Sequence, residues 1–212
     1  MVELLTWNGI GISQPRTDED YGESHYFYKT KGALPAGSEA WVDGFDHSAW
    51  ADLLPFFIKA YKANHTIDGS AFAIKTSSSS TNALASIPVT NLTDTVVFWY
   101  RPHPKDAIAS SDPLAQPTGA SFPDDDLELI AILEAPATIV IHSGGKSESY
   151  AAIQGFNQIS LEGFQEGEQK VEVVRNGVVV SCGIGEVPIT SNIEKYNFNA
   201  VVGKTVPGGC TA

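Results

Sequence analysis

Two short runs near the start of the chain, residues 6–8 and residues 20–26, combine aromatic rings with hydrogen-bonding side chains. Sugars present apolar C–H faces and a rim of hydroxyl groups, so sugar sites pair flat aromatic surfaces with carboxylates and amides. The candidate sugar-contacting residues are Trp7, Asn8, Tyr21, His25 and Tyr26. From the residues alone, an ordinary aromatic and acidic surface loop is the alternative, and it stays open.

Asp20 and Glu23 lie in the second run and are the candidate catalytic carboxyl groups. Glycoside hydrolysis uses two carboxyl groups about 5 to 9.5 Å apart, one to protonate the leaving oxygen and one to activate water or attack the sugar. Two carboxyl groups so close together in one loop do not guarantee that separation. The alternative role for Glu23 and its neighbours is contact with the substrate, with the catalytic pair elsewhere.

The element that must position these residues is a buried strand, which we expect over residues 2–7. α/β barrels place their ligand sites at polar residues that directly follow such a strand. Farther along, apolar residues recur at helical spacing over 46–62, which predicts an amphipathic helix. Its apolar stripe comprises Trp50, Leu53, Leu54, Phe57, Ile58 and Tyr61. Asp46 or Ser48 can cap the start of this helix, and Pro55 is tolerated only in its first turns or at a kink.

Beyond residue 65 the pattern changes to short β-rich runs separated by turn residues, without helices between them. These runs cover residues 71–75, 94–100, 127–133, 137–142, 148–153, 157–161, 169–175, 177–183 and 197–202. The pair Asn176-Gly177 between two valine-rich runs predicts a hairpin, because both residues accept positive φ. We therefore predict a mainly β fold, a β-sandwich domain preceded by a strand-loop-helix segment.

The composition is that of an acidic globular protein, with 42% hydrophobic residues and a formal net charge of −12. This charge repels phosphate backbones and anionic lipid, so we predict no nucleic-acid and no membrane partner, and a neutral polysaccharide fits better. No run approaches the roughly 18 apolar residues of a transmembrane helix, and residues 1–5 lack the basic start of a signal peptide. Glycosylation sequons at Asn64 and Asn91 nevertheless indicate a secreted parent protein.

The two cysteines and the metal-like residues each leave two interpretations. Cys182 and Cys210 form either a disulfide that holds the C-terminal tail or two unpaired thiols. His103, between two prolines, is expected in a rigid loop rather than at a metal, because it has no suitably spaced partner. The acidic run 124–126 lacks the pattern of a calcium-binding loop, so we expect a solvated turn. We predict no metal and no cofactor.

When residues 9–19 are set aside, residues 2–8 joined to residues 20–26 resemble the TWNDYGESHY signature of family 71 glycoside hydrolases. These enzymes are the fungal α-1,3-glucanases, also called mutanases. The likeness continues through residues 47–50, 56–62, 98–105, 196–199 and 202–203. It implies a (β/α)8 barrel followed by β domains, and hydrolysis of α-1,3-glucan. Residues 1–64 would then be the C-terminal remnant of the barrel and residues 65–212 a β-sandwich accessory domain.

By this resemblance the chain would be the C-terminal part of an α-1,3-glucanase that is not active alone, with the main catalytic pair on an earlier strand. Residues 9–19 interrupt the motif as a retained intron translated in frame would. Two alternatives concern the sandwich. It would bind glucan as a lectin-like module through Trp99, Tyr100 and Tyr150, or it would only support the barrel by burying the apolar stripe of the helix.

Overall fold

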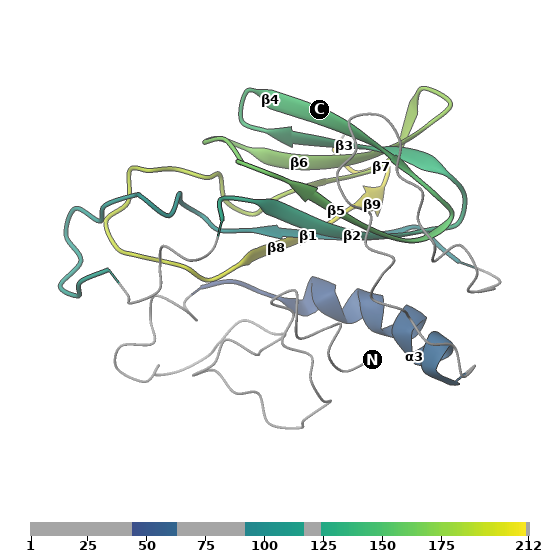
Figure 1. The fold of residues 1–212 in the computed structure, drawn as a ribbon, viewed down its shortest axis with the longest axis horizontal. Coiled ribbons are helices and arrows are strands. Elements are labelled where there is room, and N and C mark those ends of the chain that lie inside the picture. The colour runs from purple at the N-terminus through teal and green to yellow at the C-terminus, as the bar shows by residue number, and fades with distance from the viewer. Residues whose placement is uncertain (1–43, 63–91, 117–123, 211–212) are drawn as a thin grey trace.

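The computed structural model describes residues 44–62, 92–116 and 124–210. Two antiparallel sheets lie face to face, and a helical segment lies against the outer face of one of them (Figure 1). The helical segment consists of the 3-10 helix η2 (Ser48–Leu53) and the α-helix α3 (Leu54–Lys62). The strands are β1 (Thr95–Tyr100), β2 (Leu127–Leu133), β3 (Ala137–Ser143), β4 (Lys146–Ala152), β5 (Gly155–Leu161), β6 (Gln169–Arg175), β7 (Val178–Ile184), β8 (Val201–Lys204) and β9 (Val206–Pro207). The strands expected over 2–7 and 71–75, and the boundary at residue 64, lie outside the described residues.

The first sheet has the strand order β5-β2-β1-β8 and the second has the order β4-β3-β6-β7-β9. Each predicted run from 94–100 to 177–183 overlaps an observed strand, so the mainly β sandwich is confirmed. The last run differs, because β8 begins only at Val201 and β9 follows in the other sheet. The chain changes sheet at Thr205, whose N–H donates to the Val96 carbonyl at 3.0 Å.

The inner core, the apolar layer between the two sheets, is built by alternate residues of facing strands. Phe98, Leu129, Ile141 and Val173 are fully buried in this layer. Strands β3 and β6 alternate buried with more exposed residues, as strands with one solvent-facing side do. Strands β1 and β2 are buried along most of their length, which explains their continuous apolar sequences, since both faces of these strands are covered.

The helix predicted over 46–62 forms as two joined segments, η2 and α3. The N-cap residue is His47, which makes no side-chain capping bond, so the predicted cap by Asp46 or Ser48 is wrong. Asp46, just before the helix, instead accepts the Ser48 N–H on its Oδ1 at 2.7 Å. Pro55 explains the change of helix type. It has no N–H to donate to the Ala51 carbonyl, and the Leu54 N–H donates there instead, the shorter bond of a 3-10 turn. Pro55 therefore falls in the first turn of α3, where proline is tolerated.

The hairpin between β6 and β7 turns at Asn176-Gly177, as predicted. Both residues have positive φ, 52° at Asn176 and 77° at Gly177, which suits the right-handed twist of the two flanking strands. The pairing register shifts between Val173 and Val174 just before the turn. Such a shift increases the local twist of a strand pair.

Candidate functional site

The residues predicted to contact or cleave sugar in the predicted barrel remnant all precede residue 44. The described residues start at that position, so Trp7, Asn8, Asp20 and Glu23 lie outside them. The same holds for Tyr21, His25 and Tyr26. Their roles stay predictions, and the described part of the chain defines the elements that follow them.

The helical segment is fixed to the first sheet by what we call the outer core. Its helical members are Ala49, Trp50, Leu53, Phe56 and Phe57, and its sheet members are Val97, Trp99, Ile130, Ile132 and Phe156. The rings of Phe56 and Phe156 are stacked, with centroids 6.1 Å apart. His47 adds a hydrogen bond at the start of the segment, where its Nε2 lies 2.9 Å from the Ala200 carbonyl oxygen. The outer core therefore joins the segment that follows the predicted sugar-facing loop to the sandwich.

The aromatic residues expected to form a glucan-binding surface on the sandwich are mostly buried. Trp99 is 8% exposed in the outer core and Tyr100 is 2% exposed in the inner core. The Tyr100 hydroxyl donates to the Val187 carbonyl at 2.5 Å, and burial raises the pKa of Tyr100 above its ordinary value. The alternative in which Trp99 and Tyr100 bind sugar is thus not supported for these two residues, because β1 is covered on both faces. Tyr150 is partly buried and donates to Glu148 at 2.8 Å.

His103 lies in a rigid loop, as the sequence predicted. Its Nε2 accepts the Asn197 N–H at 3.0 Å, so the proton sits on Nδ1, which donates to the Pro104 carbonyl at 2.9 Å. Burial, the largest influence, lowers the pKa of His103 below its ordinary value. The ring also contacts Phe198 edge to face, with centroids 4.8 Å apart. The neutral imidazole of His103 thus connects its own loop to the loop that holds Asn197 by hydrogen bonding.

The acidic run at 124–126 holds loops together and is more than a solvated turn. The Asp125 carboxylate pairs with the buried Arg101 guanidinium and accepts the Lys105 N–H at 2.9 Å. Asp126 accepts the Gly163 N–H at 3.0 Å. The expectation of a solvated turn therefore fits only Asp124, whose side chain is 78% exposed. The spacing of the acidic residues in the sequence does not predict that the buried Arg101 pairs with this run.

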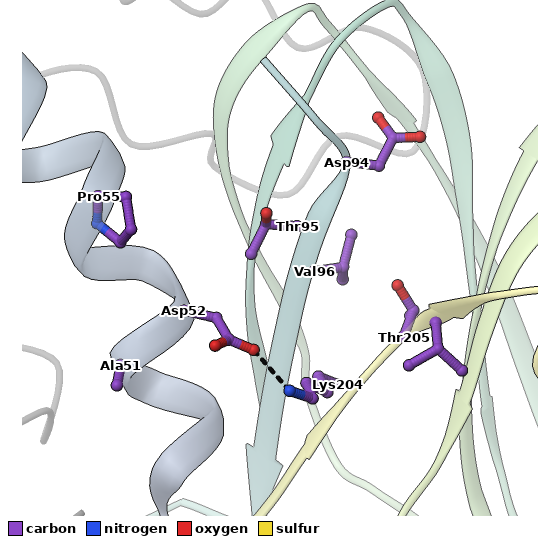
Figure 2. Close-up of a pocket in the computed structure, with 9 residues that line it drawn as sticks. Ala51, Asp52, Pro55, Asp94, Thr95, Val96, Lys204 and Thr205 are labelled. Atoms are coloured by element: carbon purple, nitrogen blue, oxygen red, sulfur yellow. Dashed lines mark hydrogen bonds and ion pairs between the residues drawn. The ribbon is translucent and has the colours of Figure 1, made fainter. Parts of the chain in front are cut away.

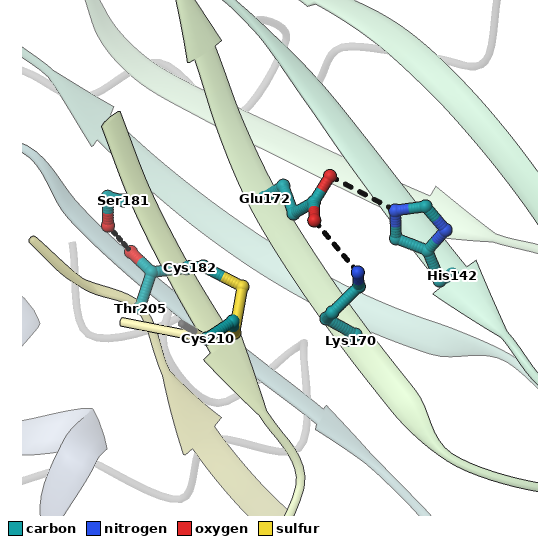
Figure 3. The surroundings of a disulfide bond; sticks show 7 residues. All are labelled: His142, Lys170, Glu172, Ser181, Cys182, Thr205 and Cys210. Carbon is teal, nitrogen blue, oxygen red and sulfur yellow. Dashed lines mark hydrogen bonds and ion pairs between the residues drawn. A yellow bond between two sulfur atoms is a disulfide. The ribbon is translucent and has the colours of Figure 1, made fainter. Parts of the chain in front are cut away.

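Cys182 on β7 and Cys210 in the tail form a disulfide, with Cα atoms 5.6 Å apart (Figure 3). The structure thus favours the first of the two interpretations of the cysteines. The bond fixes the tail beyond β9 to the second sheet, in a part of the fold where β9 itself has only two residues. Disulfides of this kind persist in oxidising compartments.

A polar cluster that the sequence did not predict lies on the solvent face of the second sheet. The Glu172 carboxylate forms an ion pair with Lys170, with Oε1 2.8 Å from Nζ. Its other oxygen, Oε2, lies 3.2 Å from Nε2 of His142 (Figure 3). His142 in turn lies 2.8 Å from the Ser147 hydroxyl. The hydrogen bond from Lys170 is the main cause that lowers the pKa of Glu172. His142 is the register partner of both Ser147 and Lys170, so cross-strand pairing accounts for the cluster.

Comparison with known proteins assigns the family. The sequence model of glycosyl hydrolase family 71 matches residues 1–211. The chain belongs to this family. A glucan endo-1,3-alpha-glucosidase of Schizosaccharomyces pombe is 34% identical over 203 residues, which is 96% of this chain and 40% of that protein. A mutanase of Penicillium rubens is 28% identical over 213 residues, which is 98% of this chain and 40% of that protein.

This family 71 chain is also similar to the ascus wall endo-1,3-alpha-glucanase of Schizosaccharomyces pombe, with 28% identity over 211 residues. It spans about 40% of the length of these curated relatives. No solved structure matches it. In the described part of the chain, no helix is long and apolar enough to cross a membrane. The family match confirms the resemblance drawn from residues 2–8 and 20–26.

Proposed function

We propose that this chain is the C-terminal part of an endo-acting α-1,3-glucanase, and that its sandwich supports the catalytic barrel. The match to glycosyl hydrolase family 71 over residues 1–211 and the names of the relatives support the activity. The outer core supports the structural role, because it buries Trp50, Leu53 and Phe57 of the predicted apolar stripe against the first sheet, although Ile58 of that stripe is exposed. The substrate is α-1,3-glucan, a neutral polysaccharide that suits a chain with a net charge of −12.

The loop from Asp20 to Tyr26 lines the sugar site in this proposal, together with Trp7 and Asn8. The aromatic rings contact the apolar faces of glucose units, and the polar groups bind hydroxyls. Asp20 and Glu23 are the carboxyl groups of this chain nearest to the reaction. The main catalytic pair lies in the upstream part of the barrel, so Asp20 and Glu23 act on the substrate beside it, and the chain alone does not hydrolyse glucan.

Structural support is favoured over a lectin-like role for the sandwich by one observation. Among the residues whose burial the structure describes, every aromatic side chain is buried or partly buried. A surface that holds a chain on insoluble glucan by itself needs flat, exposed rings, and the described sandwich uses its rings for packing instead. The lectin-like alternative would require glucan to bind mainly through groups other than Trp99 and Tyr100.

Secretion of the parent protein is part of the proposal. The Cys182–Cys210 disulfide supports it, because such bonds persist outside reducing compartments. The sequons at Asn64 and Asn91 agree with it. Treatment of the protein expressed in a fungal host with an endoglycosidase would test it, and a shift in mobility is expected.

A chimera tests the proposed activity. In the chimera, this chain replaces the matching part of the Schizosaccharomyces pombe glucosidase. Two versions are made, one with residues 9–19 of this chain and one without them. Their activity is measured as reducing sugar released from insoluble α-1,3-glucan. We expect the version without 9–19 to be active, and the Glu23→Gln form to lose at least about tenfold in activity. Glu134→Gln, an exposed carboxyl on the sandwich, is the control and should leave activity unchanged. An inactive but folded chimera, or full activity of Glu23→Gln, would contradict the proposal.

A further inference from the structure

A pocket of about 340 Å³ lies where η2 meets β1 and β8 (Figure 2). Side chains from η2, α3, β1, β8 and β9 line it, among them Asp52 of η2, Thr95 of β1 and Lys204 of β8. It opens to solvent beside the outer core and holds none of the residues predicted for the sugar site. Its volume lies near the lower end of the range seen for small-molecule sites, about 300 to 1,000 Å³.

The charges in the pocket cancel. Lys204 Nζ lies 2.7 Å from Asp52 Oδ2, so the ammonium and the carboxylate neutralise each other. The second carboxylate, Asp94, is neutralised by Arg175, whose two terminal nitrogens donate to it at 2.5 and 2.7 Å. A pocket without net charge gives no preference to a phosphate or a metal ion. It can still form hydrogen bonds to a neutral ligand, because the Asp52 and Lys204 side chains are 43% and 49% exposed.

The walls of the pocket combine apolar and hydroxyl groups. Pro55 and Val206 are exposed apolar side chains on opposite elements, α3 and β9. Thr95 and Thr205 line the sheet side, and the Thr95 hydroxyl is the exposed one of the two. Thr205 is held in place by a 2.6 Å hydrogen bond from the Ser181 hydroxyl. Apolar surface beside a few convergent hydroxyl, carboxylate and ammonium groups matches the faces and hydroxyl rim of a sugar.

We infer that this pocket is an accessory subsite for a glucose unit of α-1,3-glucan. The inference rests on the proposed function, since the choice of glucose among neutral polyols comes from the family, while the neutral polar lining comes from the structure. The Asp52 carboxylate accepts from sugar hydroxyls and the Lys204 ammonium donates to them. The site is open and has few polar groups, so it binds at millimolar strength and adds to the main site of the complete enzyme. It does not hold the chain alone on insoluble glucan.

Amide NMR of the complete 212-residue chain titrated with a soluble α-1,3-linked glucotetraose tests the subsite. The amide signals of Thr95, Lys204 and Val206 should shift with a dissociation constant of about 1 to 10 mM. Asp52→Ala and Lys204→Ala should each weaken binding about tenfold, the effect of one lost hydrogen bond to a charged group. Lys146→Ala is the matched control, because Lys146 forms an ion pair with Glu148 at 2.8 Å with similar exposure on β4.

Thermal melting shows that each variant is folded, and both side chains removed at the pocket are exposed, so folding should be preserved. Glycerol at the same hydroxyl concentration controls for general polyol binding. The subsite is rejected by the absence of shifts at these amides, by equal shifts with glycerol, or by equal binding of the Lys204→Ala and Lys146→Ala variants. An active chimera together with any of these results would reject the subsite and leave the proposed function standing.

Discussion

The indole rings of Trp50 on η2 and Trp99 on β1 meet edge to face, with their centroids 6.1 Å apart. Both side chains are more than nine-tenths buried. They belong to the outer core, which Phe156 of β5 extends toward α3 by contacts with Phe56 and Phe57. The segment that follows the predicted sugar-facing loop is therefore packed on the sandwich through a buried aromatic layer.

Replacing Trp99 with alanine should lower the free energy of unfolding of the chain by about 3 to 5 kcal/mol, because a large buried side chain leaves a cavity. Val179→Ala on β7 is the control. The Val179 side chain is 46% exposed, and its loss should change stability by no more than about 0.5 kcal/mol. Urea denaturation followed by circular dichroism measures both variants. Equal effects of the two substitutions would contradict the packing of the outer core.

The pair of Arg175 and Asp94 should make stability depend on acid pH. Burial alone would raise the pKa of Asp94, but the hydrogen bonds from Arg175 and from the Glu134 N–H, with the charge of Arg175, lower it below its ordinary value of 3.8. A carboxyl with a depressed folded pKa stabilises the fold above its unfolded pKa and loses this contribution as pH falls through the folded pKa. The contribution of Asp94 should therefore be complete above about pH 5 and shrink below about pH 4.

Asp94→Asn removes this contribution and should lower the free energy of unfolding by about 2 kcal/mol at neutral pH, with little loss below the folded pKa. Asp52→Asn is the matched control, because Asp52 pairs with Lys204 in a more exposed position and should cost at most about 1 kcal/mol. Urea denaturation at several pH values measures both. A pH dependence that is the same in Asp94→Asn and in the unmodified chain would rule out this role.

Reduction of the Cys182–Cys210 disulfide should destabilise the chain. The bond closes a loop with a sequence separation of 28. In the chain-entropy description, such a loop contributes about 3 to 4 kcal/mol. Thermal unfolding with and without dithiothreitol should show a lower midpoint in the reduced protein. In a double variant, Cys182→Ala with Cys210→Ala, dithiothreitol should have no effect, and an unchanged midpoint in the reduced unmodified chain would contradict the prediction.

His103 should oppose folding when it is protonated. Burial lowers its pKa below the ordinary value of 6.5, so the unfolded chain binds more protons than the folded one between these two values. The stability contributed by neutral His103 is complete above about pH 6.5 and is lost as pH falls toward the folded pKa. Nitrogen-15 NMR at neutral pH should show a neutral ring with its proton on Nδ1. A His103 ring that titrates like that of an unfolded peptide would contradict this account.

Local signals in the sequence predicted the elements of the fold, and non-local packing decided what they contact. Asn176-Gly177 encodes its own turn, and the spacing around Trp50 encodes one buried helix face. The continuous apolar run of β1 hides which side of the strand meets the helix, because both sides are buried. For that reason the sequence alone leaves open a sugar-binding role for Trp99, whereas the structure packs it in the outer core.

Pairs of residues far apart in sequence could not be predicted. Arg175 and Asp94 are 81 positions apart at the ends of two predicted runs, 169–175 and 94–100, and nothing in either run indicates that they pair. The same holds for the lining of the pocket, where Asp52 and Lys204 meet only because β8 lies next to β1 and under η2. The candidate sugar site came from a resemblance in residues 2–8 and 20–26, and the family match supports the resemblance without placing the side chains.

The measurement that most directly tests structural support by the sandwich is heat inactivation of the active chimera, carrying either Trp99→Ala or Val179→Ala. If the sandwich stabilises the barrel through the outer core, Trp99→Ala should lower the temperature of half-inactivation by about 5 °C or more. Val179→Ala should leave it unchanged. If Trp99→Ala unfolds the sandwich earlier while glucan hydrolysis keeps its full heat resistance, the sandwich is a separable module and the proposed role is wrong.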